Sequence, residues 1–159
     1  MAEYRGNDLI AEYLIKEKIP YVMGYAGHGA IGLLDGIYDR TDKIKVIWPR
    51  VEQAAGFMAD VYFRLTGVPI PVYASTGPGP MNLTIALANA FYDSSAFLAI
   101  TGQVTTDQFD TGALQEEYRY FPGDFPSVIK PIVKHSWQVR KVEALARYLP
   151  KAFKLMRTG

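Results

Sequence analysis

Hydrophobic and polar residues alternate along the chain in blocks that predict short strands and longer helices. Apolar residues recur every three or four positions from Leu9 to Leu14, which predicts a helix. Asn7 or Asp8 would cap this helix, and it would run through Lys18. Further helices are expected at 30–38, 52–65, 81–91, 126–130 and 142–156. Short apolar runs predict strands at 21–24, 43–48, 68–74, 96–101 and 133–139.

Alternation of strands and helices predicts parallel strand pairing, because each helix returns the chain to the same end of the sheet. Right-handed crossovers then place helices on both faces. We therefore expect a single α/β domain over residues 1–159, a three-layer αβα architecture with a doubly wound, mainly parallel sheet. Ligands bind at the carboxyl ends of the strands in such sheets. Three loops that follow strands, at 25–29, 49–52 and 75–80, should therefore share one rim.

Composition narrows the classes of function. The 159 residues are 49% apolar and 21% charged, which is typical of a globular protein. The 17 basic and 16 acidic side chains leave a formal charge of +1. This balance gives no reason to expect nucleic acid or a membrane as partner. The absence of cysteine excludes disulfides and thiolate chemistry, and two histidines far apart make a metal site within this chain unexpected. The first 20 residues lack an uninterrupted apolar stretch, and no apolar run could span a bilayer, so a cytoplasmic location is expected.

The loop Ser75–Pro80, with the sequence STGPGP, would let backbone N–H groups face a ligand. It matches neither the phosphate-binding Walker pattern nor the dinucleotide fingerprint, so it does not indicate phosphate binding. A tight strand-to-helix turn that serves only packing explains the loop equally well.

Two ionisable residues on this rim are candidates for chemistry. Glu52 lies in the first turn of a helix, beside small residues at 54–56 that could leave room for a flat ligand. The alternative is a structural cap, since the helix macrodipole stabilises a carboxylate there. His28 lies between two glycines, where its ring could transfer a proton, although a lone histidine is usually only solvated. His135, in the expected strand at 133–139, is assigned a structural role.

Six motifs occur in order along the chain: Gly24-Tyr25-Ala26-Gly27, VEQAAGFMAD at 51–60, STGPGPMN at 75–82, Ala88-Asn89-Ala90, Ile100-Thr101-Gly102-Gln103 and Leu114-Gln115-Glu116. On these motifs the chain resembles the N-terminal, pyrimidine-binding domain of thiamine-diphosphate-dependent enzymes of the acetohydroxyacid (acetolactate) synthase and pyruvate decarboxylase group. The resemblance covers essentially all 159 residues and is nearest to acetohydroxyacid synthase large subunits.

The resemblance implies a cofactor, a substrate class and a set of site residues. Glu52 would bond N1′ of the aminopyrimidine of thiamine diphosphate and favour the 4′-imino tautomer, which removes the thiazolium C2 proton before attack on a 2-keto acid. Glu52, His28 and Gln115 would be catalytic. The implied cofactor-binding residues are Tyr25, Ala26, Gly27, Glu52, Thr76, Gly77, Pro78, Gly79 and Asn82.

Two positions depart from the pattern of the synthases, which usually carry proline where this chain has Ala26 and a small residue where it has His28. Pyruvate decarboxylases place a catalytic aspartate at the second position. Acetolactate synthesis is therefore one of several expected reactions, with decarboxylation, another carboligation and C–C bond hydrolysis or cleavage as alternatives.

The resemblance also implies parts outside this sequence. Relatives continue into a last strand of the same sheet and into a domain that binds Mg²⁺ and the diphosphate, and a middle domain can hold FAD. The cofactor would lie between this domain and the diphosphate domain of another subunit or chain, in a homodimer or tetramer. We expect the isolated chain, whether a fragment or a natural split subunit, to be inactive. A non-catalytic doubly wound binding or regulatory module remains the alternative from another class.

Overall fold

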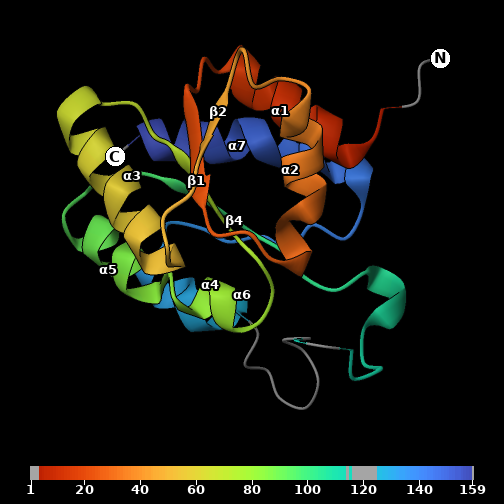
Figure 1. The fold of residues 1–159 in the computed structure, drawn as a ribbon. Helices are drawn as coiled ribbons and strands as arrows, with labels where there is room; N and C mark the ends of the chain where they lie inside the picture. Colours follow the sequence, from red (N-terminus) through yellow and green to blue (C-terminus); the bar gives the residue numbers. More distant parts are fainter. Residues whose placement is uncertain (1–3, 114, 116–124, 159) are drawn as a thin grey trace.

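The computed structural model describes residues 4–113, 115 and 125–158, and its centre is a parallel four-stranded sheet (Figure 1). The strands are β1 (Tyr21–Gly24), β2 (Lys45–Ile47), β3 (Pro71–Ala74) and β4 (Leu98–Thr101). Their order in the sheet is β2-β1-β3-β4, and all pairs are parallel. The predicted α/β fold with parallel pairing is therefore confirmed, although each strand after β1 is shorter than expected.

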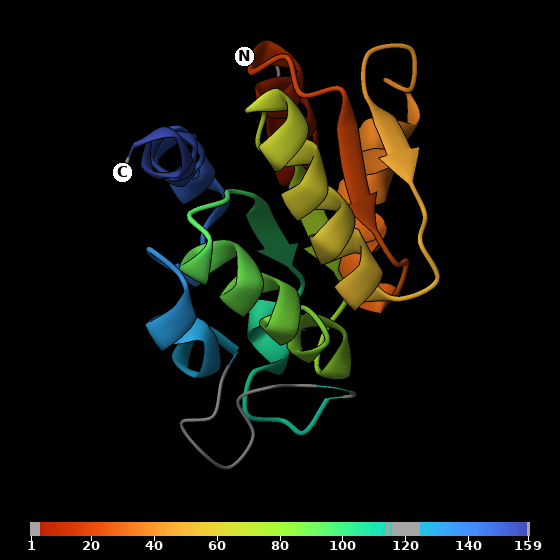
Figure 2. The same cartoon turned by 90° about the vertical axis from the view of Figure 1, so that its left-hand side faces the viewer.

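Helices cover both faces of this sheet. The helices are α1 (Gly6–Lys16), α2 (Ile31–Tyr38), α3 (Glu52–Thr66), α4 (Pro78–Met81), α5 (Thr84–Tyr92), α6 (Phe125–Ile129) and α7 (Leu145–Arg157), with 3₁₀ turns at His28–Ala30, Thr106–Gln108, Lys130–Ile132 and Val142–Ala144. Helix α3 packs against β1 and β3 and lies beside α5, while α1 contacts both α2 and α7 on the other face (Figure 2). The three-layer architecture follows from these contacts. No helix in the described ranges is both long and apolar enough to span a bilayer.

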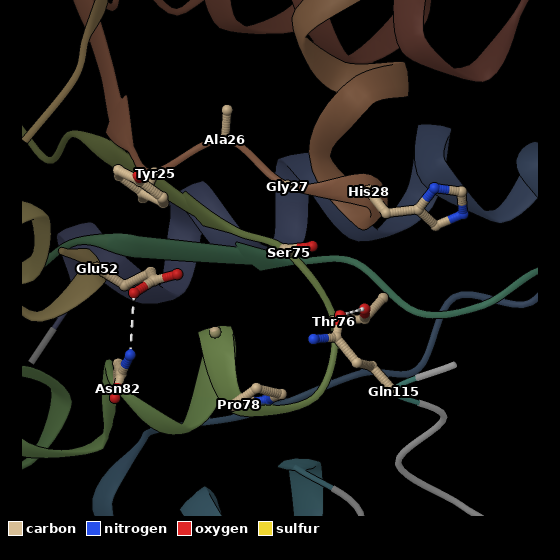
Figure 3. Close-up of a pocket in the computed structure, with 11 residues that line it drawn as sticks. Tyr25, Ala26, Gly27, His28, Glu52, Ser75, Thr76, Pro78, Asn82 and Gln115 are labelled. Carbon is tan, nitrogen blue, oxygen red and sulfur yellow. Dashed lines mark hydrogen bonds between the residues drawn. The ribbon is translucent and has the colours of Figure 1, made fainter. Parts of the chain in front are cut away.

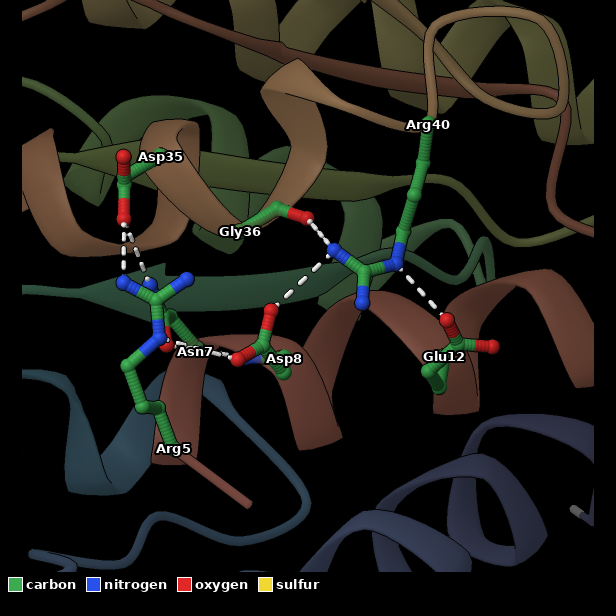
Figure 4. A network of polar contacts seen from close by, with 7 residues as sticks. All are labelled: Arg5, Asn7, Asp8, Glu12, Asp35, Gly36 and Arg40. Carbon is green, nitrogen blue, oxygen red and sulfur yellow. Dashed lines mark hydrogen bonds and ion pairs between the residues drawn. The ribbon is translucent and has the colours of Figure 1, made fainter. Parts of the chain in front are cut away.

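The start of α1 differs from the sequence prediction. The helix begins at Gly6, and no side chain caps it. Asn7 accepts the backbone N–H of Asp8 within the first turn and donates to Asp35 of α2, while the Asp8 carboxylate pairs with arginines at 5 and 40 (Figure 4). The hydrogen bond and charge of Arg5 and Arg40 outweigh burial and lower the pKa of Asp8. Two potential capping groups therefore serve as links between α1 and α2.

Two other elements differ from the prediction. The expected helix at 81–91 is split into α4 and α5, because Pro78 and Pro80 start a short helix directly after the loop. The expected strand at 133–139 is not a strand. In this segment Lys134 donates to the carbonyl groups of Leu155 and Thr158, and the ring of Trp137 lies 5.5 Å from that of Tyr148. The segment therefore packs on α7, and a strand forms only where a neighbouring strand accepts its backbone hydrogen bonds.

The motif at 51–60 and the motif at 88–90 meet inside the layer formed by α3 and α5. Asp60 of α3 is buried, with 3% of its surface exposed, and accepts from Asn89 of α5 at 2.9 Å. Arg64 pairs with Asp60 at 3.0 Å and with Asp93 at 2.6 Å. Burial alone would raise the pKa of Asp60, but hydrogen bonds from Arg64, Ser95 and Asn89 and the charge of Arg64 lower it. This network holds α3 and α5 together and lies apart from the loops at the carboxyl ends of the strands.

Candidate functional site

The strand order places one pocket where the sheet changes its direction of winding. From β1 the chain moves outward to β2, then returns past β1 to β3, so the loops that follow β1 and β3 diverge at adjacent strand ends. A crevice at such a switch point is the usual ligand site of a doubly wound sheet. A pocket of about 250 Å³ lies there (Figure 3). Its lining residues are Tyr25, Ala26, Gly27, His28, Glu52, Ser75, Thr76, Pro78, Gly79, Asn82 and Gln115.

Glu52 reaches one end of this pocket as the first residue of α3. Only 8% of its surface is exposed. Asn82 donates from Nδ2 to its Oε2 at 3.0 Å, and within the described part of the chain Oε1 accepts no hydrogen bond. Glu52 also lies in the first turn of α3, where the helix macrodipole stabilises a carboxylate. One carboxylate oxygen is thus fixed, and the other faces the pocket.

Gly79 makes the space in front of that free oxygen. A Cβ atom built on Gly79 would lie 3.2 Å from Oε1 of Glu52, so any larger residue would fill the approach to the carboxylate. The small residues after Glu52 have a different role from the one expected. Ala55 is fully buried in the core, and a Cβ on Gly56 would lie 2.4 Å from the Cβ of Ala86 on α5. Ala55 and Gly56 therefore serve packing, with Gly56 allowing α3 to approach α5 closely, and Gly79 opens the site.

The two loops are joined by Ser75, which the sequence analysis did not select. Its Oγ accepts a hydrogen bond from the backbone N–H of Gly29 at 3.1 Å, and it is buried. A Cβ on Gly27 would lie 2.5 Å from the same Oγ, so the loop after β1 approaches β3 only because Gly27 lacks a side chain. Ser75 belonged to a quoted motif, but only the three-dimensional contact shows that it holds the two loops together.

Three polar side chains gather at the other end of the pocket. The hydroxyl of Thr76 donates to Oε1 of Gln115 at 3.1 Å, and Thr76 is 2% exposed. His28 begins a 3₁₀ turn, is exposed, and carries its ring on this side of the pocket, away from Glu52 (Figure 3). The structure therefore brings all three residues expected to be catalytic to one pocket, but at opposite ends.

The remaining expected residues fall into two groups. Tyr25, which is 48% exposed, lines the pocket with Ala26 and Pro78. Gly77 does not line it; with a φ of 58°, this residue passes against Gln115 instead. Leu114 and Glu116 of the last motif lie outside the described residues.

The pocket offers several groups that can form hydrogen bonds with a small polar ligand. It offers a carboxylate oxygen, an amide, an imidazole and the backbone of a glycine-containing turn. Among the described residues, no group of three or more histidine, aspartate or glutamate side chains is arranged to hold a metal ion. Sites that enclose a whole cofactor-sized ligand usually measure about 300–1,000 Å³, so this pocket covers only part of such a ligand.

Comparison with known proteins gives a family match and several relatives. The family described as "Thiamine pyrophosphate enzyme, N-terminal TPP binding domain" matches residues 4–122. Acetolactate synthase 2, chloroplastic, of Nicotiana tabacum is 36% identical over 155 residues, which are 98% of this chain and 22% of that protein. Acetolactate synthase large subunit of Haemophilus influenzae is 35% identical over 159 residues, which are 100% of this chain and 26% of that protein. Acetolactate synthase isozyme 1 large subunit of Escherichia coli is 34% identical over 156 residues, which are 98% of this chain and 26% of that protein. The chain thus spans about a quarter of the length of these curated relatives.

Proposed function

This chain belongs to the thiamine pyrophosphate (TPP) enzyme family, since it matches the N-terminal TPP binding domain, and we propose that its pocket holds the aminopyrimidine ring of the cofactor. Thiamine pyrophosphate and thiamine diphosphate are two names for this cofactor. The single observation that carries the proposal is the buried Glu52 carboxylate with one oxygen directed into the pocket. A carboxylate in this state can accept a hydrogen bond from a ring nitrogen and share its proton.

The residues around Glu52 fit such a ring. Gly79 leaves the approach to Oε1 open, whereas an alanine Cβ would lie 3.2 Å from that oxygen. Asn82 fixes Oε2, so the carboxylate cannot turn both oxygens away from the pocket. Tyr25, Ala26 and Pro78 supply further contact surface from the two loops. These residues would bind and orient the ring, and Glu52 would hold a proton at Oε1.

The proposed substrate is a small 2-keto acid, since several relatives are acetolactate synthases. When bound, thiamine diphosphate supplies a carbon nucleophile for the keto group and accepts the electron pair that decarboxylation releases. His28 and Gln115 lie at the far end of the pocket from Glu52, where they would handle a proton and an oxygen of the substrate. Carboligation and decarboxylation are the leading reactions. C–C bond hydrolysis or cleavage is the alternative, because this chain has His28 where the synthases usually carry a small residue.

A second polypeptide surface completes this proposed site. The pocket is small and Tyr25 is half exposed, so another wall is needed to enclose a cofactor.

Large apolar side chains also remain exposed on the helices that start beside the pocket: Met58, Val61 and Leu65 on α3, and Met81, Ile85 and Tyr92 on α4 and α5. A helix that is apolar on its outer face as well as its inner face is typical of one buried between layers. We propose that the diphosphate-binding domain of another subunit or chain covers this face and supplies the Mg²⁺ site.

The sheet itself has room for the last strand expected from the resemblance. Among the described residues, β4 pairs only with β3. A groove of about 930 Å³ runs along its other side and is lined by apolar residues from β4, α5, α6 and α7, including Leu98, Ile100, Phe125, Ile129, Leu149 and Met156. A right-handed crossover through α7 would bring a parallel strand into this groove. We propose that residues beyond this sequence, in the same or a partner chain, form that strand.

The test is to assay the complete protein with pyruvate, with and without thiamine diphosphate and Mg²⁺, and to identify the products. Acetolactate would identify carboligation, and acetaldehyde would identify simple decarboxylation. A non-catalytic module would give neither product and would bind no thiamine diphosphate by calorimetry, which would contradict the proposal.

A further inference from the structure

The hydrogen bond between Thr76 and Gln115 fixes the orientation of an amide at the mouth of the pocket. The Thr76 hydroxyl donates to Oε1 of Gln115 at 3.1 Å. Because Oε1 is occupied by a donor, the Nε2 group with its two donors is left to face elsewhere. Figure 3 shows Nε2 directed into the pocket, on the side of Pro78. Gln115 therefore presents a hydrogen-bond donor to whatever enters there.

Packing fixes the rotamer of Thr76 itself. A Cβ built on Gly29 would lie 2.6 Å from the Cγ2 methyl of Thr76, so this methyl packs directly against the glycine. Thr76 is 2% exposed, and a β-branched side chain has few rotamers to choose from. With the methyl seated against Gly29, the hydroxyl is directed at Gln115. The two branches of one side chain thus have separate contacts.

The backbone of Gln115 is also held in an unusual conformation. Its φ is 60°, in the left-handed region that non-glycine residues seldom adopt. Gly77, at a φ of 58°, passes so close that a Cβ there would lie 3.0 Å from the Cβ of Gln115 and 3.2 Å from its carbonyl oxygen. Residues in such conformations persist where their surroundings over-determine them, and they gather at functional sites.

We propose that Thr76 is a positioning residue that acts through Gln115 and keeps its Nε2 group directed at an oxygen of the 2-keto acid. The proposal rests on the function proposed above and adds the residue that orients the substrate. It also differs from the sequence expectation that Thr76 contacts the cofactor. Without the hydroxyl, the Gln115 amide can rotate and present either its donor or its acceptor. A substrate carbonyl or carboxylate accepts hydrogen bonds only, so the orientation that presents the amide oxygen repels it.

Substitutions at both positions separate these roles in the complete enzyme, with thiamine diphosphate, Mg²⁺ and pyruvate as the probe substrate. Thr76→Val keeps the shape and the contact with Gly29 but removes the hydroxyl, and Thr76→Ser keeps the hydroxyl. We expect Thr76→Val to raise KM for pyruvate about five- to tenfold, the usual effect of one hydrogen bond, with thiamine diphosphate affinity by calorimetry and the unfolding temperature unchanged. Thr76→Ser should retain most of the affinity for pyruvate.

A double-mutant cycle with Gln115→Ala decides whether Thr76 acts through Gln115. The second substitution, Thr76→Val, should add nothing in the Gln115→Ala background. Additive effects, or an equal loss of thiamine diphosphate affinity in both backgrounds, would show that Thr76 contacts the ligand itself and would overturn the inference.

A crystal structure of each variant tests the positioning without any turnover. One Gln115 side-chain conformer is expected in the wild type and in Thr76→Ser, and more than one, or a rotated one, in Thr76→Val. A single unchanged conformer in Thr76→Val overturns the inference even if the enzyme turns over pyruvate. Absence of any reaction of wild type with 2-keto acids, together with the expected conformers, overturns the proposed function and its substrate but not the orienting role of Thr76.

Discussion

Each end of the pocket is built around one residue whose surroundings limit what it can do. At one end, Glu52 has one oxygen held by Asn82 and the other left open by Gly79. At the other end, His28 is exposed on a 3₁₀ turn in which the N–H group of Gly29 donates to Ser75, the residue after β3. A buried, oriented acid suits a constant partner such as a cofactor, whereas an exposed imidazole suits a substrate that enters and leaves.

Replacing His28 tests its assignment to substrate chemistry. In His28→Ala we expect kcat to fall about 100-fold if the imidazole transfers a proton, because general acid–base groups commonly contribute that much or more. The pH–rate profile or the ratio of products should change, while binding of thiamine diphosphate stays as in wild type. His135→Ala is the matched control, since His135 packs on Trp137 outside the pocket. Loss of cofactor binding in His28→Ala would instead make His28 a cofactor residue.

Single residues were also where sequence reasoning was least complete. The site residues selected from the sequence include ten of the eleven lining residues, because glycine turns and a carboxylate at strand ends have a recognisable pattern. The contact of Ser75 with the loop after β1 was missed, and Gly56, which was assigned to a ligand, packs against α5. Neither contact can be read from local sequence, because each joins residues about 30 to 46 positions apart.

At the scale of elements, α3 and α5 form a layer that depends on one buried carboxylate. Asp60 accepts from Asn89 and pairs with Arg64, which ties the two helices together below the pocket. We expect Asp60→Asn to lower the free energy of unfolding by about 1.5–3 kcal/mol, the contribution of hydrogen bonds to a charged group. Chemical denaturation at pH 7 measures this. Asp39→Asn is the control, since Asp39 is exposed and shows no salt bridge within the described residues.

The same network predicts a dependence on pH. The pKa of Asp60 is lowered in the folded state, so its contribution is fully present above the unfolded pKa of about 3.9 and is lost as the pH falls through the folded pKa. The stability difference between wild type and Asp60→Asn should therefore be constant near neutrality and shrink below about pH 4. A difference that grows on acidification would show that the carboxylate is not stabilised by these partners.

Elements differ in how far the sequence predicts them. Parallel strands buried between helices read as short apolar runs, and β1 to β4 were located for that reason. The segment at 133–139 has the alternation of a strand but packs on α7, because alternation says nothing about whether a neighbouring strand exists. Likewise, α4 is a separate short helix because Pro78 and Pro80 start it directly after the loop.

The proposed last strand predicts a pattern of amide protection along β4. Leu98 and Gly102 donate to carbonyl groups on the β3 side, so the amides of Ala99 and Thr101 face the groove. In the isolated chain these two amides should exchange quickly with deuterium, and in the complete protein they should be protected as well as Leu98. Equal, fast exchange of Ala99 and Thr101 in both forms would contradict a strand at that edge.

At the scale of the whole molecule, the sheet order accounts for where the site lies and for why it is open. The switch between β1 and β3 places the two loops at one edge, and α3 and α5 both begin there and run back along one face of the sheet (Figures 1 and 2). Their outer apolar side chains and the open pocket therefore belong to one continuous side of the molecule. One docking event would cover both.

Charged substitutions on that face test the docking. Leu65 and Ile85 are 81% and 61% exposed, so lysine at either position should leave the fold of this domain intact. In the complete protein, Leu65→Lys and Ile85→Lys should weaken subunit association about tenfold or more, measured by analytical ultracentrifugation, and lower cofactor affinity in parallel. Tyr38→Lys, at a 77% exposed position on α2, is the control. Unchanged association in both variants would place the partner elsewhere.

The most direct measurement of the whole account is the rate at which bound thiamine diphosphate exchanges its C2 hydrogen for deuterium, followed by NMR in the complete protein. In Glu52→Gln the side chain keeps its size and its place beside Asn82 but loses the carboxylate that we propose shares a proton with the ring. We expect exchange to slow by about 100-fold or more while the cofactor still binds. If exchange in this variant proceeds at the wild-type rate, Glu52 does not act on the ring, and the pocket between β1 and β3 is not the pyrimidine site.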